Sequence, residues 1–248
     1  MTSEKTVLDH TSKTSIDSQV KVLNTPEDIS NNIKSVLAKS DIKVNNPIGY
    51  KFIKRFFDIV LSLLAIVCLS PLLIIVAILI YLDDKGSPIF SQVRFTENGK
   101  IFRMYKFRSM CVNAEERLKE VQHMNESKDG VIFKIKDDPR ITKIGKFIRK
   151  TSIDELPQLF NILKGDMSIV GPRPPIAREV SQYTSYQMNR FLVKGGLTCF
   201  WQCSGRSNIG FEEQVQLDIK YIENRSVWLD IKLILKTIKT VLKMEGAS

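Results

Sequence analysis

The sequence predicts an α/β protein that is mainly helical, with a re-entrant membrane helix-break-helix, amphipathic helices in the membrane interface and a small β element. Three observations support this fold class. One long apolar run carries a proline near its middle, several later segments are basic and amphipathic, and only a few short runs have strand character. We expect a flexible polar N-terminal tail over residues 1–46, a membrane hairpin over 47–85 and a single large domain over 86–248.

Composition excludes several classes of protein. The chain has 248 residues and a formal net charge of +10, and its hydrophobic share of 43% is enough to build a core. Four Cys in this length rule out a disulfide scaffold, and two His argue against a histidine-based zinc site. The positive charge alternates with apolar residues on helical patterns rather than with aromatic ones, which argues against a nucleic-acid partner.

One short helix is expected inside the N-terminal tail. Thr25 would be its N-cap and Pro26 its first residue, because proline tolerates only the first turn of a helix. An apolar stripe then follows at helical spacing, formed by Ile29, Ile33, Val36 and Leu37.

The run from Ile59 to Leu82 contains no charged residue. A straight helix of that length would be about 36 Å long, which is enough to cross a hydrocarbon core of about 30 Å. An ordinary spanning anchor is therefore one interpretation. Pro71, however, removes the backbone bond to the carbonyl of Val67 and predicts a kink, and Ser70 can bond back to the carbonyl of Ile66. Ser70-Pro71 therefore permits a re-entrant hairpin as well.

The distribution of charge favours the hairpin. More Lys and Arg precede the apolar run than follow it, so a spanning helix would place the large C-terminal part outside the cell. That part is itself strongly basic and contains cysteines, which suits the cytoplasmic face and its anionic lipids. A re-entrant hairpin removes the conflict because it keeps both ends on the cytoplasmic side.

Two later segments have the pattern of interfacial helices. Arg140–Lys150 and Trp228–Met244 each place lysines or arginines along one side and apolar residues along the other. The alternative is the solvated face of an ordinary packed helix. Strand character is limited to Pro88–Gln92, Ile101–Phe107 and Met167–Val170.

The segment from Thr151 to Gln158 is the strongest candidate for chemistry. Pro157 predicts a helix that starts at or after Asp154, so Asp154 and Glu155 would lie at a helix N-terminus. An ionised aspartate among cations has the properties of a nucleophile toward phosphorus. The structural alternative is a capping box, since Ser152 and Glu155 have the required spacing.

Basic residues near short turns or strands are candidate phosphate ligands, because the guanidinium fork matches phosphate oxygens. Arg173 is held between Pro172 and Pro174, which restricts its backbone. The candidates are Lys106, Arg108, Arg149, Arg173 and Arg206.

Taken together and in this order, the motifs resemble the bacterial sugar transferase family, the monotopic polyprenyl-phosphate phosphoglycosyl transferases. The matching segments follow the Ser70-Pro71 break and extend the resemblance from about Tyr50 to the C-terminus. They are Lys106–Met110, Arg149–Gln158, Gly165–Pro174 and Trp201–Arg206.

This resemblance implies a catalytic domain over 86–248 on the cytoplasmic face of the bacterial cell membrane. It implies transfer of a sugar 1-phosphate from a nucleotide diphosphate sugar, usually a UDP-sugar, to undecaprenyl phosphate, with release of UMP, as the first step of surface polysaccharide synthesis. By position, Asp154 would be the nucleophile that carries the phosphosugar, and Asp154 and Glu155 would hold Mg²⁺. Further partners would be anionic lipids, a second copy of the chain or polysaccharide-assembly proteins.

A non-catalytic interpretation stays open at this point. A basic membrane-anchored module that binds acidic lipids or recruits assembly proteins would have the same charge and the same amphipathic helices. It would not explain why the Asp154-Glu155 and Arg173 segments occur together.

Overall fold

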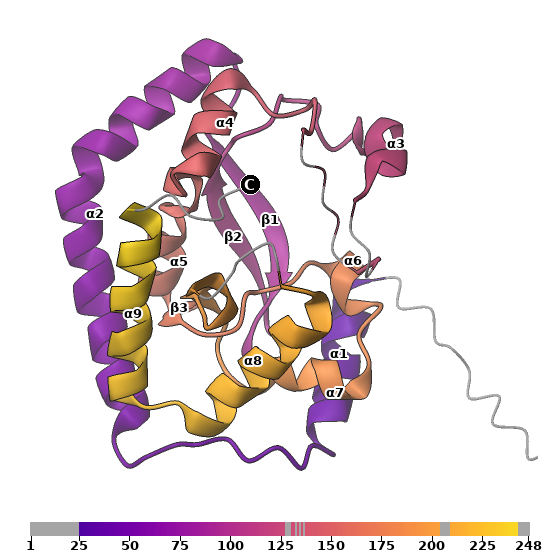
Figure 1. The fold of residues 1–248 in the computed structure, drawn as a ribbon, viewed down its shortest axis with the longest axis vertical. Coiled ribbons are helices and arrows are strands. Elements are labelled where there is room, and N and C mark those ends of the chain that lie inside the picture. The colour runs from indigo at the N-terminus through magenta and orange to yellow at the C-terminus, as the bar shows by residue number, and fades with distance from the viewer. Residues whose placement is uncertain are drawn as a thin grey trace, which may run out of the picture.

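The computed structural model describes residues 25–126, 130–131, 133, 135, 137–203 and 209–242. As expected, the protein is mainly helical with small sheets, and a long helix runs along one side of it (Figure 1). The α-helices are α1 Pro26–Leu37, α2 Tyr50–Asp83, α3 Leu118–Val121, α4 Lys143–Lys150, α5 Gln158–Lys164, α6 Ala177–Val180, α7 Ser185–Met188, α8 Phe211–Asn224 and α9 Val227–Leu242. The 3₁₀ turns are η1 Glu97–Gly99, η2 Gln122–Met124, η3 Ile153–Glu155, η4 Asn189–Leu192 and η5 Trp201–Cys203.

Two short sheets form the β element. β1 Ile89–Phe95 pairs antiparallel with β2 Ile101–Phe107, and β3 Ser168–Val170 pairs in parallel with β4 Gly196–Thr198. The second pair requires two glycines, Gly171 just after β3 and Gly196 at the start of β4. A Cβ at Gly196 would lie 2.1 Å from the backbone nitrogen of Gly171, so only a residue without a side chain permits this approach.

The short N-terminal helix is present where the sequence predicts it. The side chain of Thr25 accepts a hydrogen bond of 3.1 Å from the backbone of Asp28, and Pro26 is the first residue of α1. Ile29 and Ile33 are buried in the main core, together with residues of η4 and α8. Residues 25–46 therefore pack on the large domain, unlike the flexible tail expected for them, because the apolar stripe of α1 finds a partner surface there. Residues 1–24 lie outside the described part of the chain.

The apolar run forms one continuous helix, α2, with Pro71 inside it. Figure 1 shows that this helix changes direction partway along its length. Oγ of Ser70 donates a bond of 2.8 Å to the carbonyl of Val67 rather than to that of Ile66, so it pairs with a carbonyl that the proline leaves without its usual donor. The helix is long and apolar enough to cross a membrane, and only 11% of its most apolar window is buried. Such exposure is typical of a membrane-associated segment rather than of the core helix of a soluble protein.

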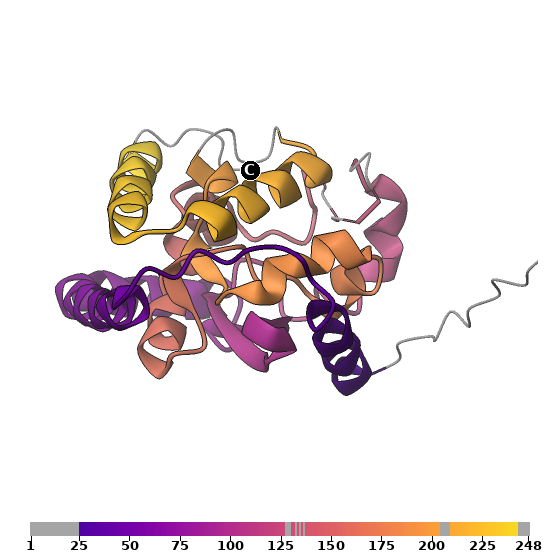
Figure 2. The same ribbon diagram turned by 90° about the horizontal axis from the view of Figure 1, so that it is seen from below.

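Contacts from different helices hold the two arms of α2. The first arm lies beside α9, as Figures 1 and 2 show, and the second arm lies beside α4, as Figure 1 shows. The guanidinium of Arg55 donates to the carbonyls of Ile162 and Leu163, at 2.6 and 2.7 Å, and so satisfies the C-terminal end of α5. At the far end, Arg108 donates to the carboxylate and the carbonyl of Asp84. The membrane helix is therefore fixed to the large domain at both ends.

The two amphipathic segments are helices. Thr142 caps α4, and the polar side of α4 carries exposed lysines, while Phe147 remains 58% exposed. On α9, Trp228, Leu235 and Ile238 are exposed although they are large and apolar. Like α2, both helices thus expose large apolar side chains. This exposure fits the prediction of interfacial helices better than the alternative of a solvated helix face.

Candidate active site

The acidic pair lies on η3, the turn between α4 and α5. Asp154 is 9% exposed, and Ser152, which precedes the turn, has a left-handed backbone with φ of 58°. α5 begins at Gln158, which agrees with a predicted start at or after Asp154, and the two carboxylates lie on the 3₁₀ turn that precedes this helix. The capping-box alternative is wrong, because the side chain of Ser152 makes no capping bond.

Lys106 reaches the acidic pair from the end of β2. Its Nζ lies 2.9 Å from Oε1 of Glu155 and 3.8 Å from Oδ2 of Asp154. The ammonium is partly buried, with 26% of the side chain exposed, so water screens these attractions less than it would at an open surface. One cation, which the sequence analysis named only as a candidate phosphate ligand, thus faces both carboxylates.

A residue that the sequence did not single out aligns these elements. Asn161 of α5 is fully buried; its side chain accepts from the backbone of Tyr105 at 2.9 Å and donates to the carbonyl of Arg103 at 2.7 Å. Both bonds join α5 to β2 just before Lys106. The sequence did contain a signal for this role: Asn161 is a polar residue within the apolar helical pattern of Leu156, Leu159, Phe160 and Leu163. A buried amide needs polar partners.

The environment of Asp154 sets its protonation. Burial, and secondarily the negative charge of Glu155, raise the pKa of Asp154 to about 6, while Lys106 and Arg149 act to lower it. The carboxylate is therefore mostly ionised at neutral pH, and it is more basic than an exposed aspartate. Arg149, in the last turn of α4, is close enough to contribute as expected.

Arg173 lies close enough to a second arginine, Arg94, for their charges to interact. Its NH1 is 3.6 Å from Oε1 of Glu179, and a third of the side chain is exposed. Arg94 of β1 is 7% exposed; burial and the positive charge of Arg173 lower its pKa, and Glu155 is close enough to raise it. Within the described part of the chain, Nε of Arg94 is buried without a hydrogen-bond partner. Arg94 is thus a candidate anion ligand that the sequence analysis missed.

Of the predicted phosphate ligands, Arg108 lies away from the acidic pair and Arg206 is outside the described residues. Arg108 is bonded to Asp84 at the end of α2, which indicates a structural role. The reason is local: β2 ends at Phe107, and the chain turns there toward the membrane helix. Arg206 lies outside the described residues, so its position relative to the acidic pair stays a prediction.

The donor set fits a Mg²⁺ ion that is shared with a substrate. Asp154 and Glu155 offer hard carboxylate oxygens, and Mg²⁺ is commonly bound by one or two carboxylates together with substrate phosphates. Among the residues that the structure describes, no group of three or more His, Cys, Asp or Glu side chains forms a complete protein site. Lys106, which faces both carboxylates, supplies part of the positive charge at this position.

The chain is similar to known proteins over most of its length. The family model described as bacterial sugar transferase matches residues 49–244. The galactosyl transferase CpsE of Streptococcus agalactiae is 52% identical over 78% of this chain and 43% of its own length. The undecaprenyl-phosphate galactose phosphotransferase of Salmonella typhimurium is 44% identical over 79% of this chain and 42% of its own length.

A third relative is the UDP-N-acetylgalactosamine-undecaprenyl-phosphate N-acetylgalactosaminephosphotransferase of Aeromonas hydrophila, which is 41% identical over 80% of this chain and 45% of its own length. The chain therefore spans less than half the length of each of these three relatives. The acidic pair, its lysine and the membrane helix all lie within the matched region, and the chain belongs to the bacterial sugar transferase family.

Proposed function

We propose that this protein transfers a sugar 1-phosphate from a nucleotide diphosphate sugar to undecaprenyl phosphate, and that Asp154 carries the phosphosugar between the two. The observation that carries this proposal is the buried carboxylate of Asp154, held beside Glu155 and facing Lys106. The names of the relatives support the acceptor and, in one case, a UDP-sugar donor.

The reaction would take place in two displacements. An oxygen of Asp154 attacks the sugar-bearing phosphorus, the bond from that phosphorus to the bridging oxygen breaks, and UMP leaves with the electron pair. A phosphate oxygen of the acceptor then attacks the same phosphorus, and the carboxylate of Asp154 leaves. Neither displacement requires a proton to be taken from the nucleophile. This suits the site, whose described residues include charged groups but no histidine.

Positive charge would stabilise the phosphate oxygens in both transition states. Lys106, Arg149, Arg94 and Arg173 are the candidates among the described residues, and such preorganised charges supply most of the catalysis in phosphoryl transfer. A Mg²⁺ ion, when bound, would neutralise diphosphate charge, and Asp154 and Glu155 are the residues that would hold it.

Membrane placement would bring the site to its lipid substrate. We infer that α2 is re-entrant, with both ends at the cytoplasmic face, because it bends partway along and both ends are bonded to the large domain (Figure 1). The exposed apolar residues of α4 and α9 would then lie in the interface, where the acceptor phosphate resides.

Purified protein in detergent or nanodiscs tests the proposal. With Mg²⁺, undecaprenyl phosphate and a panel that includes UDP-galactose and UDP-N-acetylgalactosamine, we expect UMP release with at least one sugar. Without acceptor, intact-mass measurement should find the wild-type chain heavier by one phosphosugar.

Asp154→Asn should abolish both UMP release and the adduct, while Asp166→Asn, at a partly buried carboxylate paired with the exposed Lys100, should retain them. Near-normal turnover of Asp154→Asn would exclude it as the nucleophile. Absence of UMP release with every sugar would favour the non-catalytic membrane module.

A further inference from the structure

A pocket lies between the first arm of α2, β3 and α9, on the side of the molecule that carries the exposed apolar surface. Its volume is about 130 Å³. Most of its lining is apolar, contributed by Phe57, Leu61, Ile169, Val170, Ile231 and Ile234. An apolar cavity of about 150 Å³ holds a benzene-sized molecule, so this pocket matches about one five-carbon isoprene unit.

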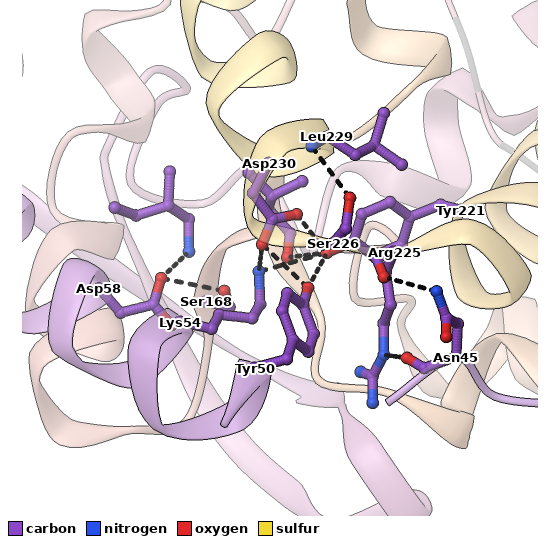
Figure 3. Close-up of polar contacts among 12 residues, drawn as sticks. Asn45, Tyr50, Lys54, Asp58, Ser168, Tyr221, Arg225, Ser226, Leu229 and Asp230 are labelled. Atoms are coloured by element: carbon purple, nitrogen blue, oxygen red, sulfur yellow. Dashed lines mark hydrogen bonds and ion pairs between the residues drawn. The ribbon is translucent and has the colours of Figure 1, made fainter. Parts of the chain in front are cut away.

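A few polar residues border the pocket, and their polar groups are already bonded to other groups of the protein. Nζ of Lys54 lies 2.8 Å from Oδ2 of Asp230, and Oδ1 of Asp58 accepts from the backbone of Ile169 at 2.9 Å and from Oγ of Ser168 at 3.0 Å (Figure 3). Two carboxylates face one ammonium there. Because these polar groups already have partners, a phosphate group would have to displace them, and the apolar pocket suits the chain of a lipid rather than its headgroup.

Strand β3 connects this pocket to the proposed active site. Ile169 and Val170 line the pocket, and Arg173 follows Val170 by three residues, a span of at most about 10 Å in an extended chain. The carbonyl of Pro174 accepts from NH1 of Arg94 at 3.0 Å, so the segment that carries Arg173 is held beside the second arginine. A lipid whose phosphate is bound at these arginines has a chain long enough to enter the pocket.

We propose that the pocket binds the polyisoprenoid chain of the acceptor and so helps to distinguish it from phospholipids. This inference rests on the proposed function, since it assigns a place to that reaction's acceptor. Methyl-branched isoprene units are wider than the methylene groups of an acyl chain. A pocket near the phosphate site, with about the volume of one isoprene unit, therefore favours the wider chain. Occupation by a phospholipid acyl chain is the competing outcome.

Filling the pocket tests this assignment. Leu61→Trp and Ile234→Trp each replace a lining residue with a larger one, while Leu64→Trp adds the same bulk on α2 at a residue that is 57% exposed and does not line the pocket. We expect both filling variants to raise the KM for undecaprenyl phosphate about tenfold, with adduct formation from the sugar donor unchanged. Leu64→Trp should leave both quantities as in the wild type.

A photolabelling experiment covers the case in which a tryptophan variant does not fold. Wild-type protein in nanodiscs is irradiated with a diazirine-bearing undecaprenyl phosphate, and the labelled peptides are identified by mass spectrometry. Labelling of α9 at Ile231 or Ile234, reduced by excess undecaprenyl phosphate but not by excess phosphatidylglycerol, supports the assignment.

Three results would overturn it: an unchanged acceptor KM in both filling variants, an equal effect of Leu64→Trp, or labelling that either lipid displaces equally. Failure of the proposed function would look different. In that case the wild type itself would release no UMP and form no adduct, whatever the photolabel contacts.

Discussion

The ammonium of Lys106 lies closer to Glu155 than to Asp154, at 2.9 Å against 3.8 Å. Glu155 thus provides the nearer ion-pair partner, and Asp154 retains the higher basicity that burial confers on it. This arrangement places the proposed nucleophile in the longer of the two ion pairs that Lys106 makes.

Lys106→Met should lower kcat/KM by about 10²–10³-fold, the usual loss when one preorganised charge is removed from a transition state. Because Lys106 lowers the pKa of Asp154, the acidic limb of the pH–rate profile should also move to higher pH. Rates measured from pH 5 to 8 check both effects. Lys100→Met, which breaks only the exposed pair with Asp166, should change neither. An unshifted acidic limb would show that Lys106 does not act on Asp154.

Asp154→Asn should stabilise the folded protein at neutral pH, although it removes activity. The folded-state pKa of about 6 exceeds the unfolded value of 3.8, so the folded state binds the proton more tightly. Ionisation of Asp154 therefore costs stability as pH rises from about 4 to 6, on the order of 2 kcal/mol at pH 7. Thermal unfolding should give a higher Tm for the variant at pH 7.5, and the difference should shrink toward pH 4.5. A variant that is less stable at pH 7.5 would contradict the burial argument.

Asn161→Leu should reduce activity because it removes both bonds between α5 and β2 and leaves a backbone amide and a carbonyl of β2 without partners. Each buried group left without a partner costs about 1–3 kcal/mol. Chemical unfolding should show this loss, and UMP release by the protein that remains folded should also fall, since Lys106 follows the affected strand segment. Asn224→Ala, which loses only an exposed bond within α8, is the matched control and should behave as the wild type.

Cysteine labelling should place both ends of α2 on the same side of the membrane. Ile48→Cys and Ser87→Cys introduce exposed thiols just before and just after the helix, in a background where the accessible Cys68 and Cys111 are replaced by serine. In spheroplasts, a membrane-impermeant maleimide should label neither position until the cells are lysed. Labelling of one position in intact spheroplasts would instead indicate a spanning anchor.

Local sequence signals predicted the elements whose boundaries are set by local chemistry. β2 has the expected bounds Ile101–Phe107, α1 starts after its Thr25 cap, and α5 ends at Lys164, just before the C-cap Gly165, whose φ is 85°. β1 extends to Phe95, beyond the expected Gln92, because pairing with β2 continues to the turn. β4 was missed because three residues carry no periodic pattern and become a strand only through pairing with β3.

The sequence by itself determined the apolar run, the acidic pair and the supply of cations, since composition and spacing are properties of the chain alone. Only the tertiary structure decided which cation faces which carboxylate. Lys106 and Arg108 are two residues apart, yet the first faces Glu155 and the second pairs with Asp84. The physical reason is that charge interactions depend on distances in space, and these distances arise when α5 packs against both β2 and the membrane helix.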